Sequence, residues 1–256
     1  MTLVLALKAS DGIVLASDGQ ATTEDPLAPT RGKAGDKLFT LHDRIAFGCA
    51  GSAGLQQRVV EALEEGISRE ECELPIGELR PMLHEIVNPL QHEALAEHVA
   101  VTAVSRPAHL EMLFAGWPSD GPWVYEICAD GHHEIHPHGE AIGHARHFPH
   151  YLMASTLHYD VLDRGIEQVM VLAYRAVIDA IKSDASSLGP PVHLVLVTDE
   201  KAWRLDDVRL QSVRDTLNGW KAQEKDIFRS LPGEPAPPAP NDDPVPGIEP
   251  KVVIES

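Results

Sequence analysis

The sequence predicts an α+β fold in which antiparallel sheets are covered by pairs of helices. Three observations predict it: strand-like apolar runs come in two groups, helical stripes separate those groups, and turn residues join neighbouring runs within a group. Strands joined by turns form hairpins, whereas a doubly wound sheet alternates single strands with single helices. A hydrophobic content of 43% over 256 residues is ample for the core of one large domain.

Two antiparallel hairpins are expected within residues 1–50. Ser10-Asp11-Gly12 is a turn signal between the first two apolar runs, and Asp43 marks the turn of the second hairpin. Residues 24–35 are rich in proline, glycine, threonine and charge without an apolar period, which predicts a loop between the hairpins. The four strands are predicted at Leu3–Lys8, Ile13–Ser17, Lys37–Leu41 and Arg44–Cys49.

Helices are expected next, followed by more strands. Leu55, Val59 and Leu63 recur at helical spacing, and a second helix is predicted over residues 75–97 with a kink where Asn88 precedes Pro89. The proline-rich acidic residues 232–256 predict a disordered tail after a domain that spans residues 1–231. The remaining predictions are strands at 98–105, 110–116 and 123–129, a helix at 166–181 and a strand at 192–198.

The charge of the chain excludes two classes of partner. Lysine and arginine total 21 against 39 acidic residues, and a formal charge of -18 repels both nucleic acid and an anionic membrane surface. Since we find neither a run of about 20 apolar residues nor a signal-peptide pattern, we expect a cytoplasmic protein. Three distant cysteines, Cys49, Cys72 and Cys128, predict reduced thiols rather than a disulfide framework or a thiolate zinc site.

The sharpest motif combines Thr2 with Ala16-Ser17-Asp18-Gly19-Gln20-Ala21-Thr22 and, after the loop, Gly35-Asp36-Lys37-Leu38. The stretch from Thr2 to Gly54 resembles a proteasome-type β subunit, and Asp-Gly-Gln-Ala-Thr is similar to bacterial peptidase rings that work with an ATP-driven unfoldase. The resemblance implies an N-terminal-nucleophile (Ntn) hydrolase with a four-layer αββα sandwich of two antiparallel sheets flanked by helices. It also implies a homo-oligomer, built as a ring or a spiral, that needs no cofactor.

A threonine hydroxyl becomes a nucleophile only when a base takes its proton, and an N-terminal threonine carries that base as its own α-amine. The α-amine has an unperturbed pKa of about 7.7–8.0, so part of it is neutral near pH 7. The chemistry therefore requires removal of Met1. Because Thr2 is small, we expect methionine aminopeptidase to remove it, and we expect no longer propeptide.

The resemblance also implies roles for other catalytic residues. Asp18 and Lys37 fall on the family's active-site acid and lysine, an ammonium that would lower the pKa of the α-amine while Asp18 offsets the cost of its burial. Gly51 falls on the glycine whose N–H stabilises the oxyanion. Asp184 and Ser187 fit the motif at a helix end that bonds the threonine and its amine, although Asp184 alone is also a common turn residue.

The substrate site is predicted by position in the same way. The resemblance places Ala21, Cys49 and Ala53 at the substrate pockets and Thr22 at the substrate backbone. Two departures from the family pattern stand out: a long loop before the active-site lysine, and His144 where the family has a serine or glycine run that completes the hydrogen bonds of the amine.

Seven histidines lie between positions 132 and 150. His136 and His138 are expected on one face of a strand, where two ligands could meet, and His132, Glu134 and Glu140 lie nearby without a standard spacing for a third. We therefore assign no metal site and favour a solvated or subunit-facing histidine surface.

The sequence favours a threonine-type endopeptidase subunit of a self-compartmentalising assembly, acting on peptides or unfolded proteins. An ATP-dependent unfoldase is a possible partner; nucleic acid and membranes are not. Two alternatives stay open. One is a weakly active or inactive ring subunit, of β-type because the first strand is not preceded by the helical extension of α subunits. The other is an Ntn amidohydrolase acting on a small amide, although such enzymes usually mature from longer precursors.

Overall fold

The computed structural model of the chain describes residues 2–20, 22–23, 30–31, 35–101, 109–150 and 163–231. Two five-stranded antiparallel sheets form its centre. The first has the strand order β10-β1-β2-β11-β12, and the second has the order β5-β6-β7-β8-β9. The strands of the first sheet are β1 (Leu3–Lys8), β2 (Ile13–Asp18), β10 (Gly139–Gly143), β11 (Val192–Val197) and β12 (Ala202–Arg204).

The second sheet and its helices follow the predicted order. Its strands are β5 (Leu38–Leu41), β6 (Ile45–Gly51), β7 (Leu110–Gly116), β8 (Trp123–Ile127) and β9 (His133–His136). The α-helices are α1 (Ala53–Gly66), α2 (Ile76–Val101), α4 (Ile166–Ser183) and α5 (Asp207–Ser230), with a 3₁₀ turn at Glu71–Glu73. A short ladder joins β3 (Thr22–Thr23) to β4 (Thr30–Arg31).

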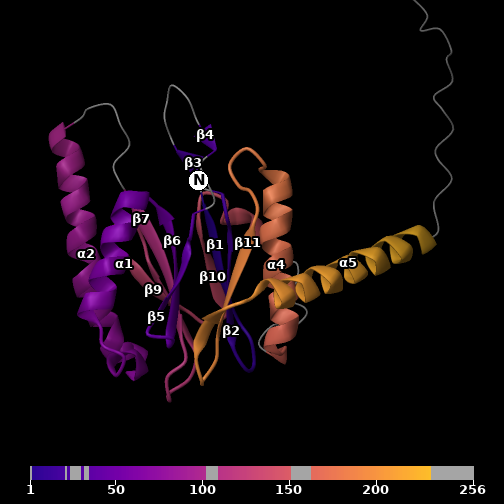
Figure 1. Cartoon of the computed structure of the whole chain (residues 1–256), viewed down its shortest axis with the longest axis horizontal. Coiled ribbons are helices and arrows are strands. Elements are labelled where there is room, and N and C mark those ends of the chain that lie inside the picture. The colour runs from indigo at the N-terminus through magenta and orange to yellow at the C-terminus, as the bar shows by residue number, and fades with distance from the viewer. Residues whose placement is uncertain are drawn as a thin grey trace, which may run out of the picture. The chain divides into compact units, whose positions relative to one another are not determined.

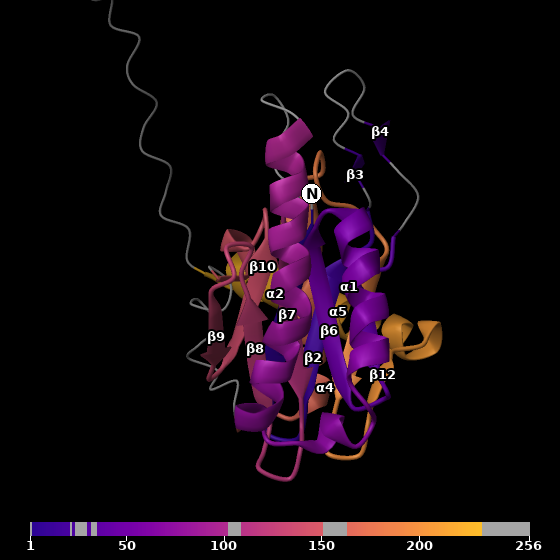
Figure 2. The ribbon, with the colours of Figure 1, turned by 90° about the vertical axis from the view of Figure 1, so that its left-hand side faces the viewer.

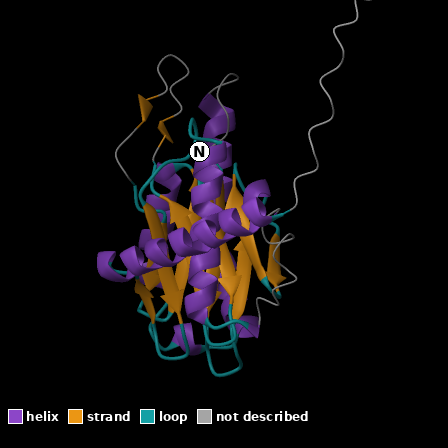
Figure 3. Ribbon diagram, turned by 90° about the vertical axis from the view of Figure 1, so that its right-hand side faces the viewer, coloured by secondary structure: helices purple, strands orange, loops and turns teal. Residues whose placement is uncertain are grey.

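The sheets are stacked, and helices cover their outer faces (Figures 1 and 3). One apolar core lies between the two sheets and includes Val4, Leu15, Leu113 and Val195. Helix α4 packs on β1, β2 and β11 of the first sheet. Strands β1 and β2 are buried on both faces, which is why they are nearly continuous apolar runs without alternation. The α+β prediction and the four-layer αββα sandwich are confirmed.

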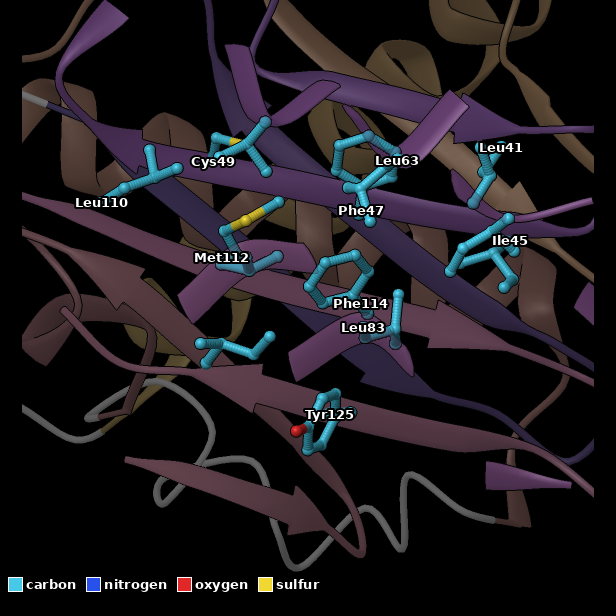
Figure 4. Close-up of a cluster of buried hydrophobic side chains, with 14 of the residues drawn as sticks. Leu41, Ile45, Phe47, Cys49, Leu63, Leu83, Leu110, Met112, Phe114 and Tyr125 are labelled. Carbon is cyan, nitrogen blue, oxygen red and sulfur yellow. The ribbon is translucent and has the colours of Figure 1, made fainter. Parts of the chain in front are cut away.

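The second core lies between the second sheet and helices α1 and α2, which lie side by side over it in Figure 2. Phe47 on β6 stacks on Phe114 on β7 at 5.4 Å between ring centroids, and Leu63 and Leu83 bring the two helices onto them (Figure 4). This core anchors the start of α1 close to the end of β6, where candidate site residues lie.

Several predicted elements need correction. The strand predicted at 98–105 is wrong for residues 98–101, which continue helix α2, and residues 102–108 lie outside the described part of the chain. A short apolar run cannot be distinguished from the end of a helix by periodicity alone. Part of the predicted loop at 24–35 forms β4. Strands β3, β10 and β12, the 3₁₀ turn at Glu71–Glu73 and helix α5 were not predicted.

The chain divides into two units, residues 1–217 and residues 218–256. Helix α5 begins in the first unit, where Leu210, Val213 and Leu217 are buried, and it continues into the second. The predicted tail, residues 232–256, lies outside the described residues, so the domain boundary at 231 stays a prediction.

Candidate active site

Asp18, the last residue of β2, is completely buried and accepts four hydrogen bonds. Its Oδ1 accepts one from the backbone N of Leu3 at 3.0 Å and one from Lys37 Nζ at 2.7 Å. Its Oδ2 accepts from the backbone N of Gln20 at 3.2 Å and from that of Gly189 at 3.4 Å. The carboxylate therefore joins the start of β1, the end of β2, the loop before β5 and the loop after α4.

Lys37 is buried together with its partner, since its side chain is 7% exposed. Burial lowers the pKa of the Lys37 ammonium, while the charge and hydrogen bond of Asp18 oppose that shift. The backbone also fixes this residue, because its carbonyl accepts from the N–H of Cys49 at 3.0 Å. Asp18 therefore holds the Lys37 ammonium and also binds the N–H of Leu3, the residue after Thr2.

Thr2 lies directly before β1, at the end of the sandwich where the N label stands beside β3 and β4 (Figure 1). Leu3 is paired with Gly143 of β10. Gly143 has a φ of 93°, and a Cβ atom placed on it would lie 2.2 Å from the carbonyl oxygen of Thr2 and 3.2 Å from Cβ of Ala50. The backbones of β1 and β10 therefore approach so closely beside Thr2 that only glycine fits.

Gly51 ends β6 in a backbone conformation that favours glycine, with a φ of 139°. A Cβ atom there would lie 2.1 Å from the carbonyl oxygen of His109, which accepts a hydrogen bond from the N–H of Ser52 at 2.9 Å. The pairing of β6 with β7 thus fixes the backbone of Gly51, the predicted oxyanion donor, just before α1 begins.

Asp184 and Ser187 lie in the turn after α4, as predicted. The hydroxyl of Ser186 donates to Asp184 Oδ1 at 2.7 Å, and the N–H of Ser187 donates to the Asp184 carbonyl at 3.2 Å. The Ser186 hydrogen bond is the largest cause that lowers the pKa of Asp184. Ser187 is 2% exposed, and two residues further on Gly189 donates to Asp18, so the turn is attached to the buried carboxylate.

His144 directly follows Gly143 and is exposed. Its charge contributes to the lowered pKa of Asp184, after the hydrogen bond from Ser186, the opposing effect of burial and the hydrogen bond from Ser187. The residue that departs from the family pattern therefore lies in the electrostatic environment of the candidate site.

The structure describes three of the four predicted substrate residues, since Ala21 lies outside the described part. Thr22 belongs to β3, where it is paired with Arg31 of β4. Ala53 is exposed at the first position of α1. Cys49 is 1% exposed in the core beneath α1 and α2, and burial raises the pKa of its thiol. The substrate roles of these four residues stay predictions.

Sequence reasoning missed three groups that hold the site together. The N–H groups of Gln20 and Gly189 complete the binding of Asp18, and Glu111 Oε2 accepts from the N–H of Gly143 at 2.7 Å. Every residue except proline has a backbone N–H, so the sequence does not show which of them bind Asp18. Glu111 does carry a signal, because it is the single charged residue in the otherwise apolar strand Leu110–Gly116.

The histidine-rich segment differs from its prediction. β9 ends at His136, and His138 lies in the bend before β10, so the two rings do not share one face of a strand. Pro137 stands between them and lacks the N–H that would extend the ladder. His136 lies instead beside Glu126 and Glu140, and one possible ligand atom from each of the three lies within 4.8 Å of the others.

The stacked antiparallel sheets between helical layers, with Thr2 at the start of the first strand, define the architecture of Ntn hydrolases of the proteasome type. The model of the family described as "Proteasome subunit" matches residues 2–190, and the chain belongs to this family.

Relatives and solved structures agree with that assignment. The proteasome subunit beta of Methanosarcina barkeri is 25% identical over 226 residues, which are 84% of this chain and 95% of the relative. That of Methanopyrus kandleri is 26% identical over 211 residues, covering 79% and 90%.

Two solved structures share the fold. Anbu, an ancestral β subunit from Yersinia bercovieri, has a TM-score of 0.68 at 17% identity and covers 92% of this chain and 100% of its own. The Anbu complex of Pseudomonas aeruginosa, solved as a helical assembly, has a TM-score of 0.70 at 19% identity, with coverage of 91% and 98%. Among the described residues, none of the helices is both long and apolar enough to cross a membrane.

Proposed function

We propose that the chain is a threonine-type endopeptidase subunit in which Thr2, exposed by removal of Met1, is the nucleophile. The observation that carries the proposal is the buried Asp18, which binds both the N–H of Leu3 and the ammonium of Lys37. A buried carboxylate and ammonium are costly to maintain because both charges lose their contact with water. Their position beside the N–H of Leu3, next to Thr2, supports a role in activating an N-terminal nucleophile.

In the proposed reaction the free α-amine of Thr2 takes the proton of its own Oγ, which attacks the scissile carbonyl carbon. The N–H of Gly51 stabilises the oxyanion. The amine then gives the proton to the leaving nitrogen, the C–N bond breaks, and an ester to Oγ remains. Water, deprotonated by the same amine, hydrolyses that ester and restores the hydroxyl.

The surrounding residues tune the amine. The Lys37 ammonium would lower the pKa of the amine by like-charge repulsion, so that more of it is neutral near pH 7. Asp184 and Ser187 would orient the amine and the hydroxyl from the turn after α4. Substrate would contact Ala21, Thr22, Cys49 and Ala53, with neighbouring subunits completing the pockets.

The proposal includes assembly, because an exposed threonine nucleophile needs to be shielded from folded proteins. We propose a homo-oligomeric ring or spiral in the cytoplasm that takes peptides or unfolded proteins. The helical assembly of the Pseudomonas aeruginosa Anbu complex supports the spiral form. An ATP-dependent unfoldase that feeds the chamber is the proposed partner.

The test is the intact mass of the purified protein after exposure to a peptidyl epoxyketone, a reagent that needs both the hydroxyl and the free amine of an N-terminal threonine. We expect loss of Met1 and a single adduct. The adduct should vanish in Thr2→Ala and persist in Thr216→Ala, a matched change at an exposed threonine of α5. Retained Met1 in an unlabelled protein contradicts the proposal.

The second candidate function is a structural subunit with little or no activity. The exposed His144 favours it, because histidine replaces a residue that the family uses to complete the hydrogen bonds of the amine. Loss of Met1 without an adduct, in protein that assembles normally, would support this candidate.

A further inference from the structure

A second cluster of buried charge lies outside the candidate active site. Glu126 is on β8, His136 ends β9 and Glu140 is on β10. His136 Nε2 lies 3.0 Å from Glu126 Oε2, and His136 Nδ1 lies 3.3 Å from Glu140 Oε2. Glu126 and His136 are 6% and 9% exposed. Each ring nitrogen of His136 thus has one carboxylate neighbour.

The neutral ring cannot satisfy both neighbours. A neutral imidazole has one N–H donor, so one of the two carboxylates would face a lone pair of the ring. Two negative charges would then converge on one neutral ring in a mostly buried site, which is unfavourable. A cation bound between the three side chains would offset this charge, and His150 contacts Glu140 at its other oxygen.

We propose that this cluster binds a divalent transition-metal ion, with one ring nitrogen of His136 and one carboxylate oxygen each from Glu126 and Glu140 as ligands. Imidazole favours zinc-like ions over calcium or magnesium, and carboxylate oxygens are accepted by both groups. Ligands at about 2.0–2.2 Å from a tetrahedral zinc ion lie roughly 3.3–3.6 Å apart. One possible ligand atom from each of the three residues lies within 4.8 Å of the others, so small shifts of these side chains would bring them to that spacing, and water would take the fourth position.

Contacts outside the three ligands support the site. Glu140 Oε1 accepts from the N–H of Ala141 at 2.8 Å and also contacts His150 Nε2. Glu126 Oε1 accepts from Cys128 Sγ at 3.4 Å. In each carboxylate one oxygen is oriented by a neighbour while the other points to His136. Outer hydrogen bonds of this kind fix metal ligands in protein sites.

The site would join the two sheets. Glu126 and His136 belong to the second sheet, whereas Glu140 belongs to β10 of the first. β10 is the partner of β1, with Glu140 opposite Ala6 and Gly143 opposite Leu3. A bound ion would therefore clamp the strand that lies beside Thr2 to the neighbouring sheet.

The experiment uses the full chain, stripped of metal with a chelator and dialysed. Zn²⁺ is titrated by calorimetry, bound zinc is counted by mass spectrometry, and thermal unfolding is measured with and without the ion. We expect one tightly bound Zn²⁺ per chain and a rise in Tm of about 5 °C at a large excess over Kd. Ca²⁺ and Mg²⁺ should bind at least about 100-fold more weakly.

Matched variants locate the ion. Glu140→Gln and His136→Asn should each weaken Zn²⁺ binding by more than about 100-fold, because loss of an outer contact alone typically costs roughly 10- to 100-fold. His132→Asn, at an exposed residue before β9, and His138→Asn in the following bend should bind as the wild type does. Equal binding by His136→Asn, or by Glu140→Gln, would assign the ion to exposed histidines and overturn the proposal.

A spectroscopic measurement keeps the proposal testable if these variants do not fold. Co²⁺ bound to the wild type should give the intense visible bands of a four-coordinate nitrogen and oxygen site, and His138→Asn should leave them unchanged. Absence of both Co²⁺ bands and tight Zn²⁺ binding overturns the proposal and leaves a doubly protonated ring between two carboxylates.

Discussion

The two buried charge clusters of this protein are built in opposite ways. At the candidate active site, the backbone N–H groups of Leu3, Gln20 and Gly189 converge on the one carboxylate of Asp18, and Lys37 supplies the matching charge. In the cluster around His136 the contacts run mainly between side chains. The first cluster is electrically balanced by Asp18 and Lys37, whereas the two carboxylates of the second face histidine rings, which carry a charge only when protonated.

The first cluster therefore depends on folding alone, whereas the charge balance of the second also depends on a bound proton or metal ion. Backbone donors around Asp18 are in place once β1, β2 and the turn after α4 have formed. The second cluster changes its net charge when the ring gains a proton or a metal ion. Substitutions should therefore damage the first cluster under all conditions and the second in a way that depends on metal.

The largest effect is expected for Asp18→Asn. The change leaves the Lys37 ammonium buried without a counter-charge and places an amide NH₂ near backbone donors. Breaking one side of a buried ion pair typically costs about 3–5 kcal/mol, which we expect as the loss in the free energy of unfolding measured by urea denaturation.

Asp36→Asn is the matched control. Its carboxylate is 61% exposed and lies 2.7 Å from Arg204, a surface ion pair. The expected loss is below about 1 kcal/mol. Similar losses for the two variants would mean that burial of the Asp18 and Lys37 pair does not govern its contribution.

The next largest effect is expected for a substitution at Gly51, which tests the backbone conformation at the end of β6. Gly51→Ala places a Cβ atom 2.1 Å from the carbonyl oxygen of His109, in a backbone conformation that alanine avoids. We expect a loss of about 2–4 kcal/mol, because strain of this kind costs about 1–3 kcal/mol before the steric clash is added.

Gly54→Ala, three residues further on in α1, is the control for that substitution. Nothing lies within 4 Å of a Cβ atom there, and alanine favours a helix over glycine by about 1 kcal/mol. We expect the stability in urea to be unchanged or slightly higher. Tolerance of alanine at Gly51 would contradict the tight backbone contact between β6 and the residue before β7.

A smaller effect is expected for Glu126→Gln in metal-free buffer. The amide keeps the shape of the side chain but removes the charge that binds His136, and a hydrogen bond to a charged group contributes about 1.5–3 kcal/mol. Glu134→Gln, exposed on β9 directly opposite Glu126, should change the free energy of unfolding by less than about 0.5 kcal/mol. Equal stabilities of the two variants would mean that the hydrogen bond between Glu126 and His136 does not stabilise the fold.

The two clusters also differ in how far the sequence predicts them. Asp18, Lys37 and Gly51 lie in short motifs, and the structure brings them to one end of the sandwich because β1, β2, β5 and β6 are adjacent hairpin strands. Their roles in catalysis remain proposals. The cluster around Glu126 depends on strand register and on the bend at His138, neither of which a local pattern specifies, so the sequence pointed to the wrong histidine pair.

The fold shows the same limit. Strongly apolar strands and the stripe of α4 were predicted closely, since burial on both faces dictates their composition. Helix α5 was missed although Leu210, Val213 and Leu217 have helical spacing and Asp206 Oδ1 accepts from the N–H of Arg209 as a cap does. Most of its other residues are polar, so its narrow apolar stripe gave a weak pattern.

The smallest expected effect concerns His144, the exposed residue that follows Gly143. If a serine there completes the hydrogen bonds of the Thr2 amine, His144→Ser should raise kcat for a peptide substrate by about 2- to 12-fold with little change in KM, the equivalent of one hydrogen bond of about 0.5–1.5 kcal/mol. His132→Ser, exposed and remote in sequence from Gly143, should leave kcat unchanged. A lower kcat in His144→Ser would reverse the interpretation: the histidine, whose charge helps to lower the pKa of Asp184, would then be a positioning residue that supports turnover.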